Sequence, residues 1–212
     1  INDALKFSMH KDKNMICYGL GVTDPKEIFS TTKDLKKIFG SKRVFDAPTS
    51  ENALTDISVG AALNKVRSVV SHQRLDFFLL AMDQLVNSAA KWHYMFGSKS
   101  SVPITIRLII GRGWGQGPTH SQNLQSWFNH IPGLKVVMPT TPFDAKGLLI
   151  SSVLSNDPVI FIEHRSLYNL KEEIPVQDYA IDLNHERLRK KGNGLTIVCL
   201  GDASLTALNA IK

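Results

Sequence analysis

Residues Lys135–Ile162 read KVVMPTTPFDAKGLLISSVLSNDPVIFI, and this stretch carries the clearest signal for the fold. Its two ends, Lys135–Met138 and Val159–Ile162, are short, apolar runs rich in β-branched residues, which is typical of buried strands. Between them, Thr140-Thr141-Pro142 begins a helix that extends to about Leu154, with proline in its first turn. A strand, a helix and a second strand of these lengths predict a parallel βαβ unit.

The same alternation extends toward the start of the chain. Strands are expected at Met15–Tyr18, Ser68–Val70 and Ile104–Ile110, and helices at Ser50–Asn64 and about Leu75–Tyr94. The run from Ile104 is apolar apart from Arg107, as expected for a strand covered on both faces. The whole pattern predicts an α/β fold with a doubly wound, mostly parallel sheet and helices on both of its faces.

After Tyr168 the alternation stops. Residues 169–194 form a charged connector, and residues 195–212 then show a new strand, Leu195–Leu200, and the start of a helix, Ala203–Ile211. So short a segment cannot bury a core of its own. We therefore expect one complete domain at residues 1–168, a linker, and the truncated start of a second α/β domain, in a piece of a longer chain.

The composition excludes several classes of protein. Hydrophobic residues make up 43% and charged residues 21%, which are ordinary values for a globular chain and unlike those of disordered, collagen-like or coiled-coil sequences. The apolar runs are too short to span a membrane, and no signal-peptide pattern opens the chain. Cys17 and Cys199 lie in apolar runs, so we expect two core thiols in a reduced compartment, the cytoplasm or an organelle matrix.

The net charge of +6 does not indicate a nucleic-acid partner. The basic cluster at residues 171–191 is mixed with acidic residues, and no arginine-rich helix or aromatic RNA-binding pattern occurs. We expect solvated faces or an anionic protein partner. The seven histidines show no metal-ligand spacing.

Two segments are candidates for chemistry. The first, Arg43–Asn52, reads RVFDAPTSEN and runs from a strand end to Ser50, a good helix N-cap residue, with Glu51 in the first turn. In a doubly wound sheet such turns line the ligand crevice. The residues alone equally allow Glu51 to do no more than complement the helix dipole.

The second segment, Gly111–Gln122, reads GRGWGQGPTHSQ. Its alternating glycines permit positive φ and close approach of the backbone to a ligand. The spacing fits neither a Walker loop nor the dinucleotide fingerprint, and His120 alone is as consistent with a structural role. Phe77 and Phe78, on the helix that begins at about Leu75, are expected in the core, or with one ring facing a ligand.

Taken in this order, the segments resemble the β chain of the thiamine-diphosphate-dependent 2-oxo acid (pyruvate) dehydrogenase E1 component. That chain supplies a transketolase-like pyrimidine-binding domain, and the resemblance covers nearly the whole sequence. The matching segments are Arg43–Asp46, Pro48–Glu51, Ala81–Lys91, Tyr94-Met95, His120–Gln122, Pro132–Val137, Asp144–Leu149 and Asp157–Val159.

The resemblance implies roles for several residues at the cofactor. Glu51 matches the glutamate that hydrogen-bonds N1′ of the aminopyrimidine, where a protonated carboxyl drives the 4′-amino group toward the imino base that the chemistry needs. Phe77 matches the aromatic residue that stacks on the pyrimidine, and Thr49 and Gln73 align with residues lining that pocket. His120 matches a histidine at the substrate end, which steadies charged intermediates or guides acyl transfer.

The resemblance places part of the site on another chain. The Gly-Asp-Gly motif with a later Asn, which holds the diphosphate and Mg²⁺ in this superfamily, is absent, since Gly201-Asp202-Ala203 does not match it. The implied partner is an α-type E1 chain that carries this motif, in a heterotetramer, and a lipoyl acyltransferase core is a further implied partner. A potassium site of some members aligns, largely through backbone carbonyls, with Ile104, Ser152, Val153, Ser155 and Asp157.

Two departures from the family pattern bear on the substrate and on activity. Gly19-Leu20-Gly21 stands where related β chains carry Gly-Glu-Asp, and Arg74 stands where some carry an aromatic residue. If His72, Arg74 and Arg112 all add positive charge near the substrate entrance, the substrate is a more anionic or bulkier 2-oxo acid than pyruvate.

The sequence leaves three functions open. The first is the pyrimidine-domain subunit of an enzyme that decarboxylates a 2-oxo acid and passes the fragment to a lipoyl-type acceptor. The second is a split transketolase-like carboligase, which transfers a ketol unit without oxidation. The third is a non-catalytic assembly subunit of the same fold. The loss of the acidic pair at Leu20-Gly21 favours the third, whereas Glu51, Phe77 and His120 argue against it.

Overall fold

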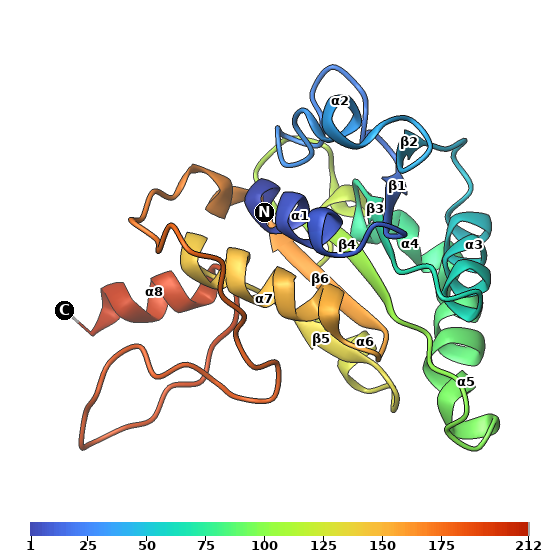
Figure 1. Cartoon of the computed structure of the whole chain (residues 1–212). Coiled ribbons are helices and arrows are strands. Elements are labelled where there is room, and N and C mark those ends of the chain that lie inside the picture. The colour runs from blue at the N-terminus through green and yellow to red at the C-terminus, as the bar shows by residue number, and fades with distance from the viewer. Residues whose placement is uncertain (212) are drawn as a thin grey trace.

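Six parallel strands form one sheet in the order β2-β1-β3-β4-β6-β5 (Figure 1). The computed structural model describes residues 1–211. The strands are β1 Ile16–Gly19, β2 Val44–Asp46, β3 Ser68–His72, β4 Ile104–Ile110, β5 Lys135–Val137 and β6 Val159–His164. Each strand expected before residue 169 is present, and β2 is the strand whose end lies in the Arg43–Asn52 segment.

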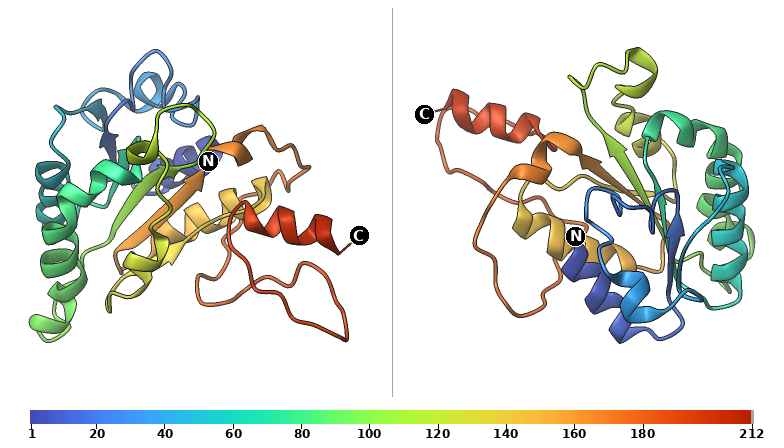
Figure 2. Two further views of the ribbon diagram at one scale, coloured as in Figure 1. Left: turned by 180° about the vertical axis from the view of Figure 1, so that it is seen from behind. Right: turned by 90° about the horizontal axis from the view of Figure 1, so that it is seen from above.

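Helices cover both faces of the sheet, as Figure 2 shows from above. Successive strand residues point to opposite faces, so Cys17 joins one buried cluster and Tyr18 the other. The doubly wound α/β fold predicted from the sequence is confirmed. One face carries α3 Glu51–Leu63, the helical segment after β3, and α6 Gln125–Asn129, while the other carries α1 Asn2–Lys11, α2 Leu35–Phe39 and α7 Pro142–Leu154.

The helix expected at about Leu75–Tyr94 is divided into four segments. It begins as α4 Leu75–Phe78, continues as the 3₁₀ turn η1 Leu79–Ala81 and the π-helix η2 Gln84–Ala89, and ends as α5 Ala90–Met95. No single helical period describes such a segment, so apolar spacing predicted its presence but not its internal changes of pitch. No helix in the described part of the chain has both the length and the apolarity that crossing a membrane requires.

The prediction of a strand at Leu195–Leu200 is wrong. These residues have no regular structure, and Leu195 and Val198 are 80% and 87% exposed. A strand needs a neighbour to satisfy its backbone hydrogen bonds, and none of the six strands within residues 1–211 pairs with this segment. Cys199 is consequently half-buried, so only Cys17 is a core thiol. The helix that follows is confirmed as α8 Ala203–Ala210.

A buried ion pair joins the neighbouring strands β4 and β6. The guanidinium of Arg107 donates to both carboxylate oxygens of Glu163, at 2.6 and 2.9 Å, and both side chains are almost fully buried. The hydroxyl of Tyr168, in the 3₁₀ turn η4 Arg165–Asn169, also donates to Glu163, at 2.8 Å. Arg107 donates further to the Thr31 hydroxyl at 3.0 Å, so four parts of the chain meet at one charge pair.

Removing one partner of this pair should destabilise the fold strongly. Glu163→Ala leaves the guanidinium of Arg107 buried without a counter-charge, and we expect the free energy of unfolding to fall by about 3–5 kcal/mol. Lys135→Ala is the control, because it breaks the partly exposed pair of Lys135 with Asp157, and such pairs contribute about 0–1 kcal/mol. Urea unfolding followed by circular dichroism measures both variants, and equal losses would contradict this role of Glu163.

Candidate active site

A cavity of about 490 Å³ opens at the carboxyl ends of β1, β2 and β3. The chain runs from β1 to β2 on one side of β1 and then to β3 on the other, so the segments that follow β1 and β3 diverge. Such a reversal of strand order is where ligands bind in open parallel sheets. The cavity is lined by Leu20, Gly21, Asp24, Asp46, Ala47, Thr49, His72, Gln73, Arg74, Phe77, Gln116 and His120.

The structure brings six of the predicted site residues to this one cavity. They come from the end of β3 and from the segments that follow β2, β3 and β4, which are far apart in the sequence. Glu51 and Arg112 do not line the cavity. A second cavity, of about 180 Å³ beside Thr140 and Tyr168, contains none of the predicted residues. The six are Thr49, His72, Gln73, Arg74, Phe77 and His120.

Glu51 is the first residue of α3, two positions after Thr49, and is only 6% exposed. Within residues 1–211 no hydrogen bond or ion pair engages its carboxylate. Ser50 is the N-cap residue, as predicted, but its hydroxyl bonds the Asn52 side chain at 2.9 Å instead of a helix N–H. A favourable helix dipole contributes about 0.3–1 kcal/mol, whereas burying an unpaired ion costs several kcal/mol. The dipole alone therefore does not account for a buried carboxyl at this position.

Phe77 and Phe78 have different surroundings, which resolves the choice that the sequence left open. Phe78 is fully buried in the core beneath the cavity. Phe77 is 41% exposed, lines the cavity and meets the His120 ring edge-to-face, with 5.1 Å between the ring centroids. Phe77 is therefore the ring available for stacking on another aromatic group.

His72 does not supply the expected positive charge. It is buried at the end of β3, and neither ring nitrogen has a hydrogen-bond partner in the described part of the chain. Burial lowers the pKa of His72 to about 4, so the imidazole is neutral at pH 7. Arg112 is exposed and outside the cavity lining. Of the three predicted cations, Arg74 alone lines the cavity in a charged form.

Sequence reasoning missed an aromatic and cationic cluster beside Arg74. The guanidinium carbons of Arg74 and Arg165 lie 4.6 and 4.7 Å from the ring centroid of Trp114. The indole N–H of Trp114 donates to the carbonyl of His120 at 3.0 Å, which fixes the loop that carries this histidine. The loop bends through Gly113, Gly115 and Gly117, all at positive φ as predicted, and a tryptophan among these glycines was the available signal.

Gly21 stands where related β chains carry an acidic residue, and its surroundings show the structural effect of this difference. Its φ is +77°, and a Cβ at this position would lie 1.8 Å from Nε2 of Gln73. An acidic side chain cannot stand there while Gln73 holds its place, from which its amide donates to Asp24 at 3.4 Å. The glycine thus allows Gln73 to approach the loop after β1.

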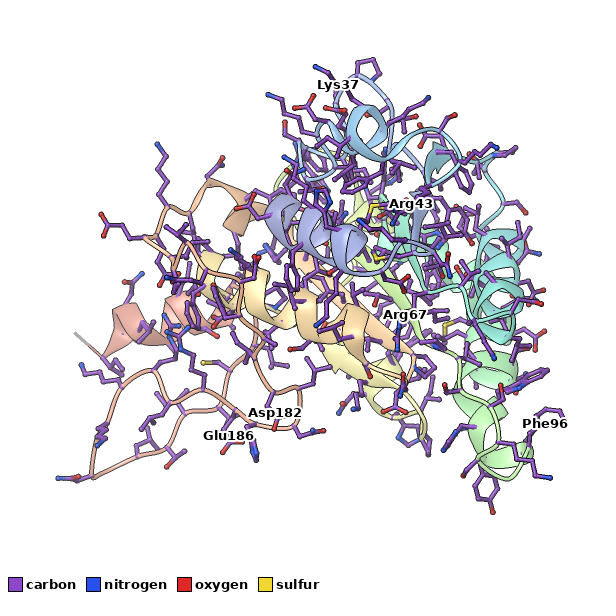
Figure 3. The ribbon with its side chains drawn as sticks, in the orientation of Figure 1. Lys37, Arg43, Arg67, Phe96, Asp182 and Glu186 are labelled. Carbon is purple, nitrogen blue, oxygen red and sulfur yellow. The ribbon has the colours of Figure 1, made fainter. Side chains whose placement is uncertain are left out.

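The positions aligned with a potassium site lie at the opposite, amino-terminal end of β4 and β6. There the guanidinium of Arg67, labelled in Figure 3, donates to the carbonyl oxygens of Val153 and Ser155, at 3.1 and 2.5 Å. The carbonyl oxygens of two of the five aligned residues, Val153 and Ser155, are thus already bound by a guanidinium. This arrangement does not fit a potassium ion. No group of three or more metal-ligating side chains occurs among residues 1–211.

The chain is similar to several known proteins. The chain is 38% identical to the acetoin:2,6-dichlorophenolindophenol oxidoreductase subunit beta of Bacillus subtilis, over 99% of this chain and 65% of that protein. It is 37% identical to the pyruvate dehydrogenase E1 component subunit beta of Staphylococcus epidermidis, over 100% of this chain and 66% of that protein. The chain therefore spans just under two thirds of the length of these relatives.

A solved structure described as a split gene transketolase, inactive beta4 tetramer, superposes with a TM-score of 0.62 at 14% identity. The match covers 77% of this chain and 49% of that one, and at this identity it supports the fold alone. The family described as the transketolase pyrimidine binding domain matches residues 1–171, which include all six strands and the whole cavity. This chain belongs to the transketolase pyrimidine-binding domain family.

Proposed function

We propose that this chain is the β-type, pyrimidine-domain subunit of a thiamine-diphosphate-dependent enzyme that decarboxylates a 2-oxo acid. The observation that carries the proposal is the cavity at the reversal of strand order that Thr49, Phe77 and His120 line, with the almost fully buried Glu51 two positions after Thr49. The relative named as a pyruvate dehydrogenase E1 component subunit beta supports this reaction class, and the one named as an acetoin oxidoreductase subunit beta supports an oxidoreductase, since acetoin has no carboxyl group to lose.

The residues at the cavity fit the pyrimidine half of this cofactor. Glu51 would hydrogen-bond the pyrimidine N1′, because its side chain is almost fully buried and its carboxyl has no hydrogen-bond partner among the described residues. Phe77 would stack on the ring with its exposed face, while Thr49 and Gln73 would line the pocket. When bound, the cofactor supplies the carbanion chemistry of decarboxylation. His120, fixed by Trp114, would face the substrate end.

The other half of the site is proposed to come from an α-type chain. That chain would bind the diphosphate through Mg²⁺, because the Gly-Asp-Gly motif is absent here. The relatives' names as beta subunits support a heteromeric assembly, which we propose to be a heterotetramer serving a lipoyl acyltransferase core in the cytoplasm or an organelle matrix. We also propose that residues 1–168 form the pyrimidine domain, 169–194 a linker, and 195–212 the start of a second domain.

Replacing Glu51 tests the proposal directly. Glu51→Gln keeps the size and hydrogen bonding of the side chain but cannot lend a proton to N1′, so we expect kcat to fall by about 10²–10⁴-fold in the complex with the α-type chain. Asn52→Ala, at the exposed neighbouring position, should retain activity. Thermal unfolding and gel filtration should show both variants folded and assembled. Full activity of Glu51→Gln would refute the role given to Glu51.

The adjacent phenylalanines provide a matched pair for cofactor binding. Phe77→Ala removes an exposed ring, so we expect the Kd for thiamine diphosphate to rise about 3–10-fold, the worth of an aromatic stack, with little change in Tm. Phe78→Ala empties part of the core and should instead lower the free energy of unfolding by about 3–5 kcal/mol. Calorimetric titration of the complex measures the first effect, and an unchanged Kd for Phe77→Ala would contradict the stacking role.

The potassium site remains a proposal only on the condition that Arg67 leaves its carbonyl partners. With Arg67 in place, we expect Tm to be unchanged when choline chloride replaces KCl at constant ionic strength. In Arg67→Ala the freed carbonyls of Val153 and Ser155 can accept an ion, and potassium should then raise Tm. A potassium-dependent Tm in the unmodified chain would show instead that the ion displaces the guanidinium.

A further inference from the structure

The cavity contains a cation that cofactor binding does not explain. Arg74 lines the cavity beside Phe77 and His120 and is half-buried. One terminal nitrogen of its guanidinium donates to the Gln73 carbonyl at 2.7 Å, and the other to the Gln116 side-chain oxygen at 3.0 Å. With the Trp114 ring against its face, the guanidinium is held in one orientation.

This orientation leaves donors available. Each terminal nitrogen of a guanidinium carries two N–H groups, and the hydrogen bonds formed within residues 1–211 use one on each. Nε–H, which is buried, also has no partner, so three of the five N–H groups are unused within these residues. Neighbouring N–H groups of a guanidinium match the two oxygens of a carboxylate, so a positioned guanidinium with unused N–H groups at a cavity is suited to bind an anionic group.

A second guanidinium adds positive charge beside Arg74. Arg165 stacks on the same Trp114 ring and on Phe29, at 4.7 and 4.8 Å. Burial lowers the pKa of Arg74, the charge of Arg165 lowers it further, and Asp76 opposes them. Two like charges placed this close repel each other, and an anion bound at Arg74 would relieve that repulsion.

The acidic residues near the cavity are engaged elsewhere. Asp46 accepts from the backbone N–H groups of Val22 and Thr23, and Asp24 from those of Lys26 and Glu27. Asp76 accepts from the N–H of Gln122 at 3.1 Å. Asp24 follows β1 and Asp46 ends β2, whereas Arg74 and Arg165 follow β3 and β6, so Asp76 alone of these three carboxylates shares a strand end with Arg74.

We propose that Arg74 binds a second carboxylate of the substrate, so that the enzyme acts on dianionic 2-oxo acids, with one carboxylate lost as CO₂ and the other retained at the far end. Arg165 acts as a positioning residue, through Trp114. The proposal rests on the proposed function and specifies its substrate class. Arg74 determines specificity, and its charge is not required for the chemical step.

Two substrates of equal carbon number test this in the complex with the α-type chain. 2-Oxoglutarate carries the second carboxylate and 2-oxopentanoate carries a methyl group in its place. Arg74→Leu should raise KM for 2-oxoglutarate by about 10-fold or more, as expected for loss of hydrogen bonds to a charged group, and leave KM for 2-oxopentanoate within about 2-fold. The KM of Arg74→Lys for 2-oxoglutarate should lie between those of the unmodified complex and Arg74→Leu. Arg112→Leu, at an exposed arginine outside the cavity, should change KM for neither substrate.

Equal KM values for the two substrates, or equal changes for both in Arg74→Leu, would overturn the proposal. Calorimetry with glutarate, a dianion without a 2-oxo group, provides a readout that needs no turnover, with pentanoate as its monoanionic control. Saturable glutarate binding that Arg74→Leu abolishes supports the anion site even if no 2-oxo acid is decarboxylated, in which case the proposed function alone fails. Absence of glutarate binding in the unmodified complex overturns the anion site.

Discussion

The pairing of β1 with β3 is the constraint on which the candidate site depends. The two strands run side by side in parallel, with Gly19 opposite Ser71, yet the helices that follow them pack on opposite faces of the sheet. Because the chain leaves the two strand ends in opposite directions, the ends cannot cover each other and a cavity remains. Gly19 maintains this pairing, since a Cβ at its position would lie 2.2 Å from the Ser71 carbonyl oxygen.

Neutral and charged groups are distributed unevenly around that cavity. His72 is kept uncharged by burial, and the buried Glu51, which begins α3, has no protein counter-ion among the described residues. Arg74 and Arg165 lie on the side of β4 and β6, held against Trp114. The cavity therefore combines an exposed aromatic ring, that of Phe77, with a guanidinium, that of Arg74.

The sequence allowed prediction wherever a local pattern reflected burial. The bounds of β4 were predicted without error because the strand is buried on both faces and reads as one apolar run, and α7 begins at its Thr-Pro signal. The same reasoning failed at Leu195–Leu200, where β-branched residues pair with no strand of the described part of the chain. A strand is a property of two segments, and composition describes only one.

For the site, the turns after β2, β3 and β4 were identified, but the contacts between them were not. These contacts join residues separated by tens of positions. Arg74 and Arg165 stack on Trp114, and Arg67 donates to the carbonyls of Val153 and Ser155. No spacing rule connects such residues, because the sheet order that brings them together is itself set by the packing of the whole domain.

The central claim is that this chain holds only the pyrimidine half of an active site. The most direct measurement is thiamine-diphosphate-dependent decarboxylation of a panel of 2-oxo acids by the full-length chain, with and without its co-expressed α-type partner. We expect activity in the mixture alone. Decarboxylation by the chain without a partner would contradict the claim that it holds only half of the active site. A complex that binds the cofactor and decarboxylates none of the acids would contradict the reaction and favour the carboligase.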